Sequence, residues 1–270
     1  MKTIREAVLR GEPIDFAPFV DVHGHWGPWA ITCVPHCQDA GRLRDEMDRY
    51  GCDMVWMSAS EPGYGDAMRV TNDIVFGLAR ELPDRVIPYC TLSACEQDRC
   101  LEELRRCLAL GPCIGVKMHR YHQPAYTLKA DFLQPVLETL EAEGVIYMNH
   151  DLGDLDTLRW AAAKYPRLTF MDGHFRVASR DLCAEHTNVC DCTCAAMVPD
   201  EVRVEVARRG RSDNLLVGSD IGLLCLAFGI GMVAYADIPE PDKRNILGLN
   251  AIRLLERTRW FRKPMIRKAW

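Results

Sequence analysis

Two histidines near the start of the chain have a spacing that suits a metal ion. The short apolar run from Phe19 to Gly27 carries Asp21, His23 and His25 at alternate positions. On an extended strand alternate side chains share one face, so both imidazoles would point the same way, with Asp21 beneath them. Neutral imidazole is the commonest metal ligand among side chains. The pair therefore predicts half of a divalent-metal site, although a lone His-x-His also occurs as a surface pair or core filler.

Other residues capable of chemistry stand where later apolar runs end, namely Lys117, His119, His150, His174 and Asp220. Each has a plain structural interpretation: His150 could bond a loop, His174 could follow a turn, and Asp220 could be an N-cap. A lysine within a buried strand also needs an anionic partner. Together, however, histidines and an aspartate from several strands supply the nitrogen and oxygen donors that zinc and related divalent metals prefer.

The elements that must position these residues alternate regularly along the chain. Strands are expected at 19–25, 52–58, 86–92, 114–119, 145–150, 168–174, 189–195 and 215–220. Helices are expected at 40–50, 68–82, 97–110, 132–143, 155–165, 180–185 and 201–209, and after the last strand, including 246–257. Alternation of this kind implies a parallel sheet.

Eight strand-then-helix units predict an α/β fold, the (β/α)₈ TIM barrel, for which about 250 residues is typical. An open doubly wound sheet is the alternative, and it is weakened because no GxGxxG motif follows the first strand. No linker or shift in composition divides the chain, so we expect one domain over residues 1–270. In such a barrel the functional residues lie at the carboxyl ends of the strands, which is where the candidate residues above fall.

Composition excludes several classes of function. The 270 residues are 48% hydrophobic and 26% charged, which is ordinary for a globular protein, and the net charge of −5 gives no reason to expect nucleic acid or an anionic membrane as partner. The longest uncharged run, 221–236, is shorter than the roughly 20 residues of a membrane span, and it could be buried or form the interface of a homo-oligomer. The opening residues do not resemble a secretory signal and the 13 cysteines are odd in number, so we expect reduced thiols and a cytoplasmic location.

Two groups of cysteines need separate interpretation. Cys190, Cys192 and Cys194 alternate along the seventh expected strand, as in a packing stripe of small side chains. With Cys183 and His186 nearby, a structural zinc or iron–sulfur site is the alternative. A second group, at residues 33, 36 and 37, lies in the loop after the first strand and could place a metal-sensitive thiol near a substrate.

The order of these motifs resembles the amidohydrolase superfamily. The resemblance rests on Asp-x-His-x-His in the first strand, histidines ending the fifth and sixth, and Gly-Ser-Asp ending the eighth. Further segments that agree are Pro83-Asp-Arg85, Gly115-Val-Lys-Met-His119 and the run from Gly248 to Leu255. More closely, the chain is similar to the amidohydrolase-related branch that includes aminocarboxymuconate-semialdehyde decarboxylase.

This resemblance implies a metal centre and assigns roles around it. His23, His25, His150 and Asp220 would bind one divalent ion, with Zn²⁺ expected ahead of Mn²⁺, Fe²⁺ or Co²⁺. Metal-bound water would become the nucleophile, Asp220 would accept its proton, and His174 would act as an acid or base.

The resemblance also places a small-molecule substrate over the metal. Lys117 and His119 would bind or polarise it, or a carboxylated Lys117 would bridge two metals. Trp26 could form an apolar wall, and Arg176 or Arg120 could hold a carboxylate.

The expected activity is hydrolysis of an ester, lactone or amide of a small, carboxylate-bearing molecule. Nonoxidative decarboxylation of an aromatic or muconate-type acid is the alternative, because the same ligands serve both reactions. A non-catalytic, cysteine-rich metal or redox protein is the third hypothesis.

Overall fold

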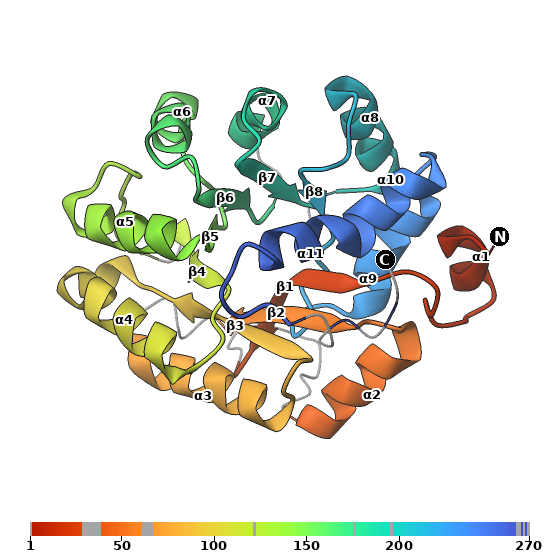
Figure 1. Ribbon diagram of the computed structural model, residues 1–270, viewed down its shortest axis with the longest axis horizontal. Coiled ribbons are helices and arrows are strands. Elements are labelled where there is room, and N and C mark those ends of the chain that lie inside the picture. Colours follow the sequence, from red (N-terminus) through yellow and green to blue (C-terminus); the bar gives the residue numbers. More distant parts are fainter. Residues whose placement is uncertain are drawn as a thin grey trace.

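A computed structural model describes residues 2–28, 39–60, 67–120, 123–174, 177–194 and 197–262, together with 266 and 268. Eight parallel strands lie side by side in sequence order and are surrounded by helices (Figure 1). The strands are β1 Val20–Trp26, β2 Met54–Ala59, β3 Val86–Thr91, β4 Gly115–Met118, β5 Ile146–Asn149, β6 Thr169–Asp172, β7 Val189–Cys192 and β8 Leu215–Leu216. The prediction of a (β/α)₈ barrel is confirmed, whereas the assignment of residues 1–270 to one domain stays a prediction.

The helices follow the strands with short connections. They are α1 Ile4–Leu9, α2 Ala40–Tyr50, α3 Met68–Glu81, α4 Cys100–Leu110, α5 Gln134–Glu143, α6 Leu155–Lys164, α7 Val177–Glu185, α8 Pro199–Arg209, α9 Leu226–Tyr235, α10 Glu240–Arg244 and α11 Asn250–Leu255. Short 3₁₀ turns at Ala94–Arg99 and Asp131–Leu133 precede α4 and α5, and a π turn at Asn245–Leu249 precedes α11.

The barrel closes between β1 and the segment that continues β8. The backbone N–H of Val22 donates to the carbonyl of Val217 at 3.0 Å, and that of His25 donates to the carbonyl of Ile221 at 2.7 Å. In return the N–H of Asp220 donates to the carbonyl of His23 at 2.9 Å. The two predicted ends of the metal motif are therefore hydrogen-bonded neighbours.

The expected strand at 215–220 is four residues shorter in the structure. The N–H of Val217 donates to the carbonyl of Ile246 at 3.0 Å rather than to a neighbouring strand. Asp220 then adopts φ of 60°, which no regular strand allows. Helix α1 is an element that hydrophobic periodicity did not indicate; the Thr3–Glu6 capping box at its start is its local signal.

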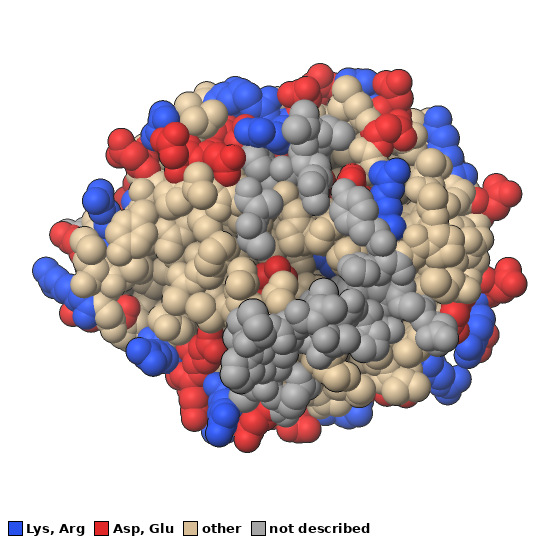
Figure 2. Space-filling model, turned by 180° about the vertical axis from the view of Figure 1, so that it is seen from behind, with Lys and Arg blue, Asp and Glu red and all other residues tan. Residues whose placement is uncertain are grey.

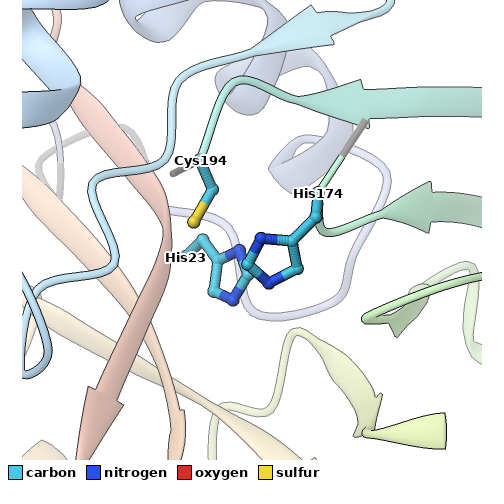
Figure 3. Close-up of side chains that lie close together, drawn as sticks. All are labelled: His23, His174 and Cys194. Carbon is cyan, nitrogen blue, oxygen red and sulfur yellow. The ribbon is translucent and has the colours of Figure 1, made fainter. Parts of the chain in front are cut away.

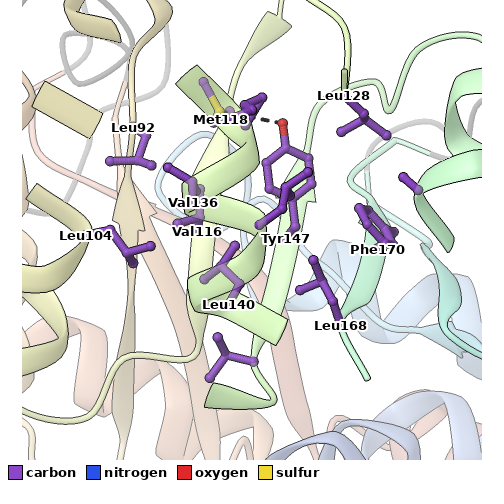
Figure 4. Packing of buried hydrophobic residues seen from close by; sticks show 14 of the residues in the cluster. Leu92, Leu104, Val116, Met118, Leu128, Val136, Leu140, Tyr147, Leu168 and Phe170 are labelled. Atoms are coloured by element: carbon purple, nitrogen blue, oxygen red, sulfur yellow. Dashed lines mark hydrogen bonds between the residues drawn. The ribbon is translucent and has the colours of Figure 1, made fainter. Parts of the chain in front are cut away.

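The strands are buried on both faces, as parallel strands of a barrel are. Outward-facing Val116, Tyr147 and Phe170 pack with Leu104 of α4 and Val136 of α5 (Figure 4). The interior is filled by a second cluster that includes Trp56 and Tyr89 of neighbouring strands. Helix α11 contributes Ile252 and Leu255 to this interior cluster, next to residues that begin the strands. The helix therefore covers the amino-terminal end of the barrel, and the histidines lie at the opposite end.

The apolar run 221–236 contains α9, which packs against α1, α2 and α8 of its own chain (Figure 1). Leu226, Ile230 and Val233 are buried there, so burial within the chain accounts for this run; a homo-oligomer stays a prediction. Among the described residues, no helix is long and apolar enough to cross a membrane. On the face opposite to that in Figure 1, acidic and basic side chains alternate around the rim (Figure 2).

The cysteine stripe lies inside the barrel. Cys190, Cys192 and Cys194 are buried and belong to the interior cluster, as the packing interpretation requires. All eleven cysteines within the described residues are free thiols. The second group, Cys33, His36 and Cys37, lies outside the described residues.

Candidate metal centre

His23 and His25 direct their rings toward the same point inside the mouth of the barrel. Gly24, between them, faces the other way: a Cβ on it would lie within 3.0 Å of side-chain atoms of Val55, Met57 and Ile221. The two Nε2 atoms are 3.2 Å apart, and both side chains are almost completely buried. The alternation predicted from the sequence therefore brings both imidazoles together.

Backbone carbonyls fix which ring nitrogen of each histidine carries its proton. The Nδ1 of His23 lies 3.1 Å from the carbonyl oxygen of Gly173, and the Nδ1 of His25 lies 3.1 Å from that of Ala59. Since a carbonyl can only accept a hydrogen bond, both Nδ1 atoms must donate, which leaves a lone pair on each Nε2. Burial, aided by the charge of Lys117, lowers the pKa of His23 well below its usual value, so this ring is neutral and able to bind a metal.

Asp220 supplies a carboxylate oxygen at the same point. Its Oδ1 is 3.1 Å from the Nε2 of His25 and 3.8 Å from the Nε2 of His23. Burial would raise its pKa, but the neighbouring groups His25, His174 and Lys117 outweigh burial and lower the pKa to about 2. Asp220 is therefore ionised at neutral pH. Its left-handed backbone conformation is the kind of strain that is often found at functional sites.

The spacing of these three donors fits a divalent ion. Ligand bonds of about 2.0–2.1 Å place tetrahedral donors about 3.3 Å apart and octahedral donors about 2.9 Å apart. The observed separations of 3.2 Å and 3.1 Å lie between these limits, and the third, 3.8 Å, exceeds them slightly. Two lone pairs and a carboxylate converging in a buried space call for a cation between them.

A buried carboxylate holds the two halves of the site together. The Oδ1 of Asp21 accepts hydrogen bonds from the backbone N–H groups of His23 and Ser219, each at 3.0 Å, and the hydroxyl of Ser219 donates to Oδ2. Asp21 is fully buried. It therefore positions the donors of β1 relative to Asp220 rather than serving as a ligand itself.

Lys117 reaches the centre from β4. Its side chain is fully buried, and Nζ lies 2.9 Å from the Nε2 of His23. Burial lowers the pKa of Lys117, while the charges of Cys194 and Asp220 act in the opposite direction. Asp220 therefore supplies the negative charge expected near Lys117, although it acts at longer range. The group in direct contact with the Nζ of Lys117 is the imidazole of His23.

The other three histidines form a row of rings that leads outward from His23. Ring centroids are 5.1 Å apart between His23 and His174, 3.8 Å between His174 and His150, and 4.0 Å between His150 and His119. His174 and His119 are each 9% exposed, more than His23 or His25, so the row runs toward the opening of the barrel.

Two groups of possible ligand atoms lie within 4.8 Å of one another among the described residues. One consists of His23, His25 and Asp220, and the other of His23, His174 and Cys194 (Figure 3). His150 belongs to neither group; its ring packs against that of His174 at an angle of 49°, and its role as a ligand stays a prediction.

The remaining predicted residues lie around this centre or outside the described residues. Trp26 is 9% exposed and belongs to a buried hydrophobic cluster, which leaves little of it to face a substrate. Arg120 follows β4, and its guanidinium is 3.8 Å from the carboxylate of Asp151. Arg176 lies outside the described residues. Sequence reasoning favoured packing for Cys194, with a structural zinc or iron–sulfur site as the alternative, and did not place it beside His23 and His174, although its place at the end of a strand was the signal that singled out the histidines.

A parallel barrel with histidine and aspartate donors at the carboxyl ends of its strands defines the class of metal-dependent (β/α)₈ enzymes. The sequence profile of the amidohydrolase family matches residues 20–257. The chain therefore belongs to the amidohydrolase family, and the resemblance seen in the sequence is confirmed. A search of curated proteins found no significant match.

Several solved structures share the fold. The 5-carboxyvanillate decarboxylase LigW from Sphingomonas paucimobilis has a TM-score of 0.68 at 17% identity, covering 88% of this chain and 98% of its own. The 2,6-dihydroxybenzoate decarboxylase from Rhizobium has a TM-score of 0.70 at 18% identity, covering 88% and 98%. A dihydroxybenzoic acid decarboxylase from Polaromonas, solved with manganese and the inhibitor 2-nitroresorcinol, has a TM-score of 0.68 at 17% identity, covering 88% and 97%.

Proposed function

We propose that this chain is a metal-dependent, nonoxidative decarboxylase of a small aromatic or muconate-type acid. The observation that carries the proposal is the convergence of His23 Nε2, His25 Nε2 and the Asp220 carboxylate on one buried point, with Lys117 Nζ beside it. Three structures with this fold are named as decarboxylases of hydroxylated benzoic acids. Their names support this reaction over the hydrolysis expected from the sequence.

The centre suits an anionic substrate. A divalent ion held by His23, His25 and Asp220 would hold an oxygen of the acid and draw off negative charge. The Lys117 side chain would offer a second positive charge in a space without bulk water, where charge interactions are strong. His119, at the outer end of the row of rings, would line the entry for the substrate.

Decarboxylation requires one proton at carbon. As the bond between the ring carbon and the carboxylate carbon breaks, carbon dioxide leaves and its bonding electrons remain on the ring carbon, which then takes up a proton. Asp220 is ionised at neutral pH and cannot donate one. His174 is close enough to contact a molecule over the centre and is more exposed than the other histidines of the donor groups, so we assign it as the proton donor.

The test is release of carbon dioxide by purified, metal-loaded protein. Hydroxybenzoates and muconate-type acids are the substrates to try, and we expect His174→Asn to keep the metal while losing most of the release. The matched control is His186→Asn, because His186 lies just beyond α7, away from the centre, and should keep full activity. Absence of release from every acid, with cleavage of an ester or lactone instead, would overturn decarboxylation.

Hydrolysis is the second candidate, and one observation favours it. The low pKa of Asp220 makes its carboxylate available to accept a proton from an attacking water. The same assay therefore includes ester, lactone and amide substrates. We also propose that the substrate is a small molecule and that the protein is cytoplasmic. The metal of the proposed centre is manganese or zinc.

A further inference from the structure

We propose that the amino-terminal end of the barrel carries a second small-molecule site, which binds an organic acid with a flat apolar body and one negative charge. The site is a cavity of about 590 Å³ between α3, α4 and the chain that follows α11 (Figure 1). This volume lies within the range of small-molecule sites, about 300–1,000 Å³. The proposed function does not use this cavity.

The cavity lies at the opposite end of the barrel from the candidate metal centre. Val86, which begins β3, and Pro112, which comes shortly before β4, both line it. Strand β3 is six residues long, so about 17 Å of strand separates its two ends. The lining also includes Pro83 and Asp84 of the Pro83-Asp-Arg85 segment, a motif that the metal centre does not use. A ligand bound here would therefore lie far from the candidate metal ligands.

Apolar side chains form much of the wall of this cavity. Phe76 and Ile87 are buried, whereas Leu110 at the end of α4 is 46% exposed. Trp260 also lines the cavity, and the guanidinium carbon of Arg259 lies 4.1 Å from the centre of its ring. A ligand with an apolar body would remove this surface from water, which is favourable. The wall therefore suits a flat hydrocarbon body such as an aromatic ring.

The described charged side chains at the cavity leave a net positive charge. Three arginines and one aspartate line it, namely Arg80, Arg259, Arg262 and Asp84. Arg259 is balanced by Glu143, whose carboxylate lies 3.3 Å from its guanidinium. Among the described residues, neither Arg80 nor Arg262 makes an ion pair or hydrogen bond through its guanidinium. These two arginines, set against Asp84, leave one positive charge in a chain whose overall net charge is −5.

A single positive charge favours a carboxylate over a phosphate as the anionic group. A carboxylate carries one negative charge and accepts two parallel hydrogen bonds from a guanidinium. A phosphate monoester carries a charge of about −1.5 to −2 near pH 7, and Asp84 would repel the excess. Arg80 and Arg262 are exposed, whereas Phe76 and Ile87 are buried, so the carboxylate would lie at the opening and the apolar body inside. The ligand class is therefore an aromatic carboxylic acid.

The experiment is a calorimetric titration of the whole, metal-free protein with 2-naphthoate, a flat aromatic carboxylate. Removing metal beforehand prevents a metal ion from holding the acid at the other end of the barrel. We expect one 2-naphthoate per chain, and binding of the neutral 2-naphthamide should be weaker by about tenfold or more. Arg80→Gln and Arg262→Gln should each weaken binding of 2-naphthoate by about three- to tenfold. Arg5→Gln, which changes an exposed arginine on α1, is the matched control and should leave binding unchanged.

Ala79→Phe tests the place of binding without changing any charge. Ala79 lies half-buried on α3 and lines the cavity, so the added ring should fill it and abolish binding. If this variant is unstable to urea, the two arginine variants decide, because exposed side chains contribute little to folding.

Several results would overturn the second site. They are no binding of 2-naphthoate to the wild type, equally tight binding of 2-naphthamide, and binding that is unchanged in the variants of the cavity. Tighter binding of 2-naphthyl phosphate than of 2-naphthoate would overturn the choice of a carboxylate. Because the titration uses metal-free protein, a failure to release carbon dioxide would refute the decarboxylase and leave this site in place.

Discussion

Replacing Gly218 by alanine should displace His23 and so weaken metal binding at the candidate centre. Gly218 opens the Gly-Ser-Asp segment, and an added Cβ would overlap the sulfur of Cys192 and lie 2.8 Å from the Cβ of His23. Carbon atoms this close must separate, and both neighbours belong to buried parts of the barrel. The strain therefore falls on His23, whose ring must keep its orientation to bind a metal.

The size of the effect follows from two terms. Overfilling a packed interior costs about 1–3 kcal/mol of folding stability. If His23 moves to relieve the overlap, its hydrogen bond to the carbonyl of Gly173 is stretched or lost. Loss of such an orienting bond lowers metal affinity by about 10- to 100-fold, which corresponds to about 1.4–2.7 kcal/mol.

The assay is a competition titration against a coloured chelator, paired with urea unfolding of the metal-free protein. Gly231→Ala is the matched control: this glycine lies within α9 and a Cβ on it meets nothing within 4 Å. The control should gain about 0.5–1 kcal/mol of stability from lower backbone entropy and keep its metal affinity. If Gly218→Ala binds metal as tightly as the wild type, the placement of His23 against Gly218 is wrong.

Three further outcomes can be measured on the same protein. Ser58→Ala removes an oxygen that lies 3.0 Å from the Nδ1 of His25. This substitution should weaken metal binding by about tenfold in the chelator titration. Unchanged binding would mean that the carbonyl of Ala59 alone orients the ring. Glu205→Gln should lower urea-unfolding stability by about 3 kcal/mol, since its fully buried carboxylate binds three arginines; an unchanged midpoint would contradict this. Burial would raise the pKa of Glu205, but hydrogen bonds from Arg208 and Arg180 outweigh it and lower the pKa. The wild type should therefore lose this stability as pH falls below about 4.3 through the lowered value, whereas Glu205→Gln should show a flatter acid limb.

The barrel was predictable because its local signals agree with its tertiary structure. Helix α2 begins and ends at the expected residues, since Asp39 caps its start and Gly51, with φ of 71°, ends it. Apolar runs gave all eight strands in order. The last strand was overestimated because the N–H of Val217 donates to a distant partner, the carbonyl of Ile246, which replaces one bond of the expected ladder.

The candidate site was predictable in its membership but not in its detailed roles. The ends of parallel strands meet at one edge, so listing strand-end residues was enough to bring together His23, His25, His174, Lys117 and Asp220. Which ring approaches the common point depends on side-chain directions that spacing does not fix. His150 was expected as a ligand; its ring packs against that of His174 at an angle of 49°, outside both groups of close donors, and its role as a ligand stays a prediction.

The closed barrel determines which ring nitrogen of His23 and of His25 carries the proton. The proton on Nδ1 of His25 is held by the carbonyl of Ala59 on the adjacent strand, 34 positions away in sequence. The proton on Nδ1 of His23 is held by the carbonyl of Gly173, across the barrel and 150 positions away. Both acceptors are backbone carbonyls, which every residue has, so the sequence does not identify them. The sequence can therefore indicate a pair of candidate metal ligands, whereas the fold alone determines that both Nε2 lone pairs face the same point.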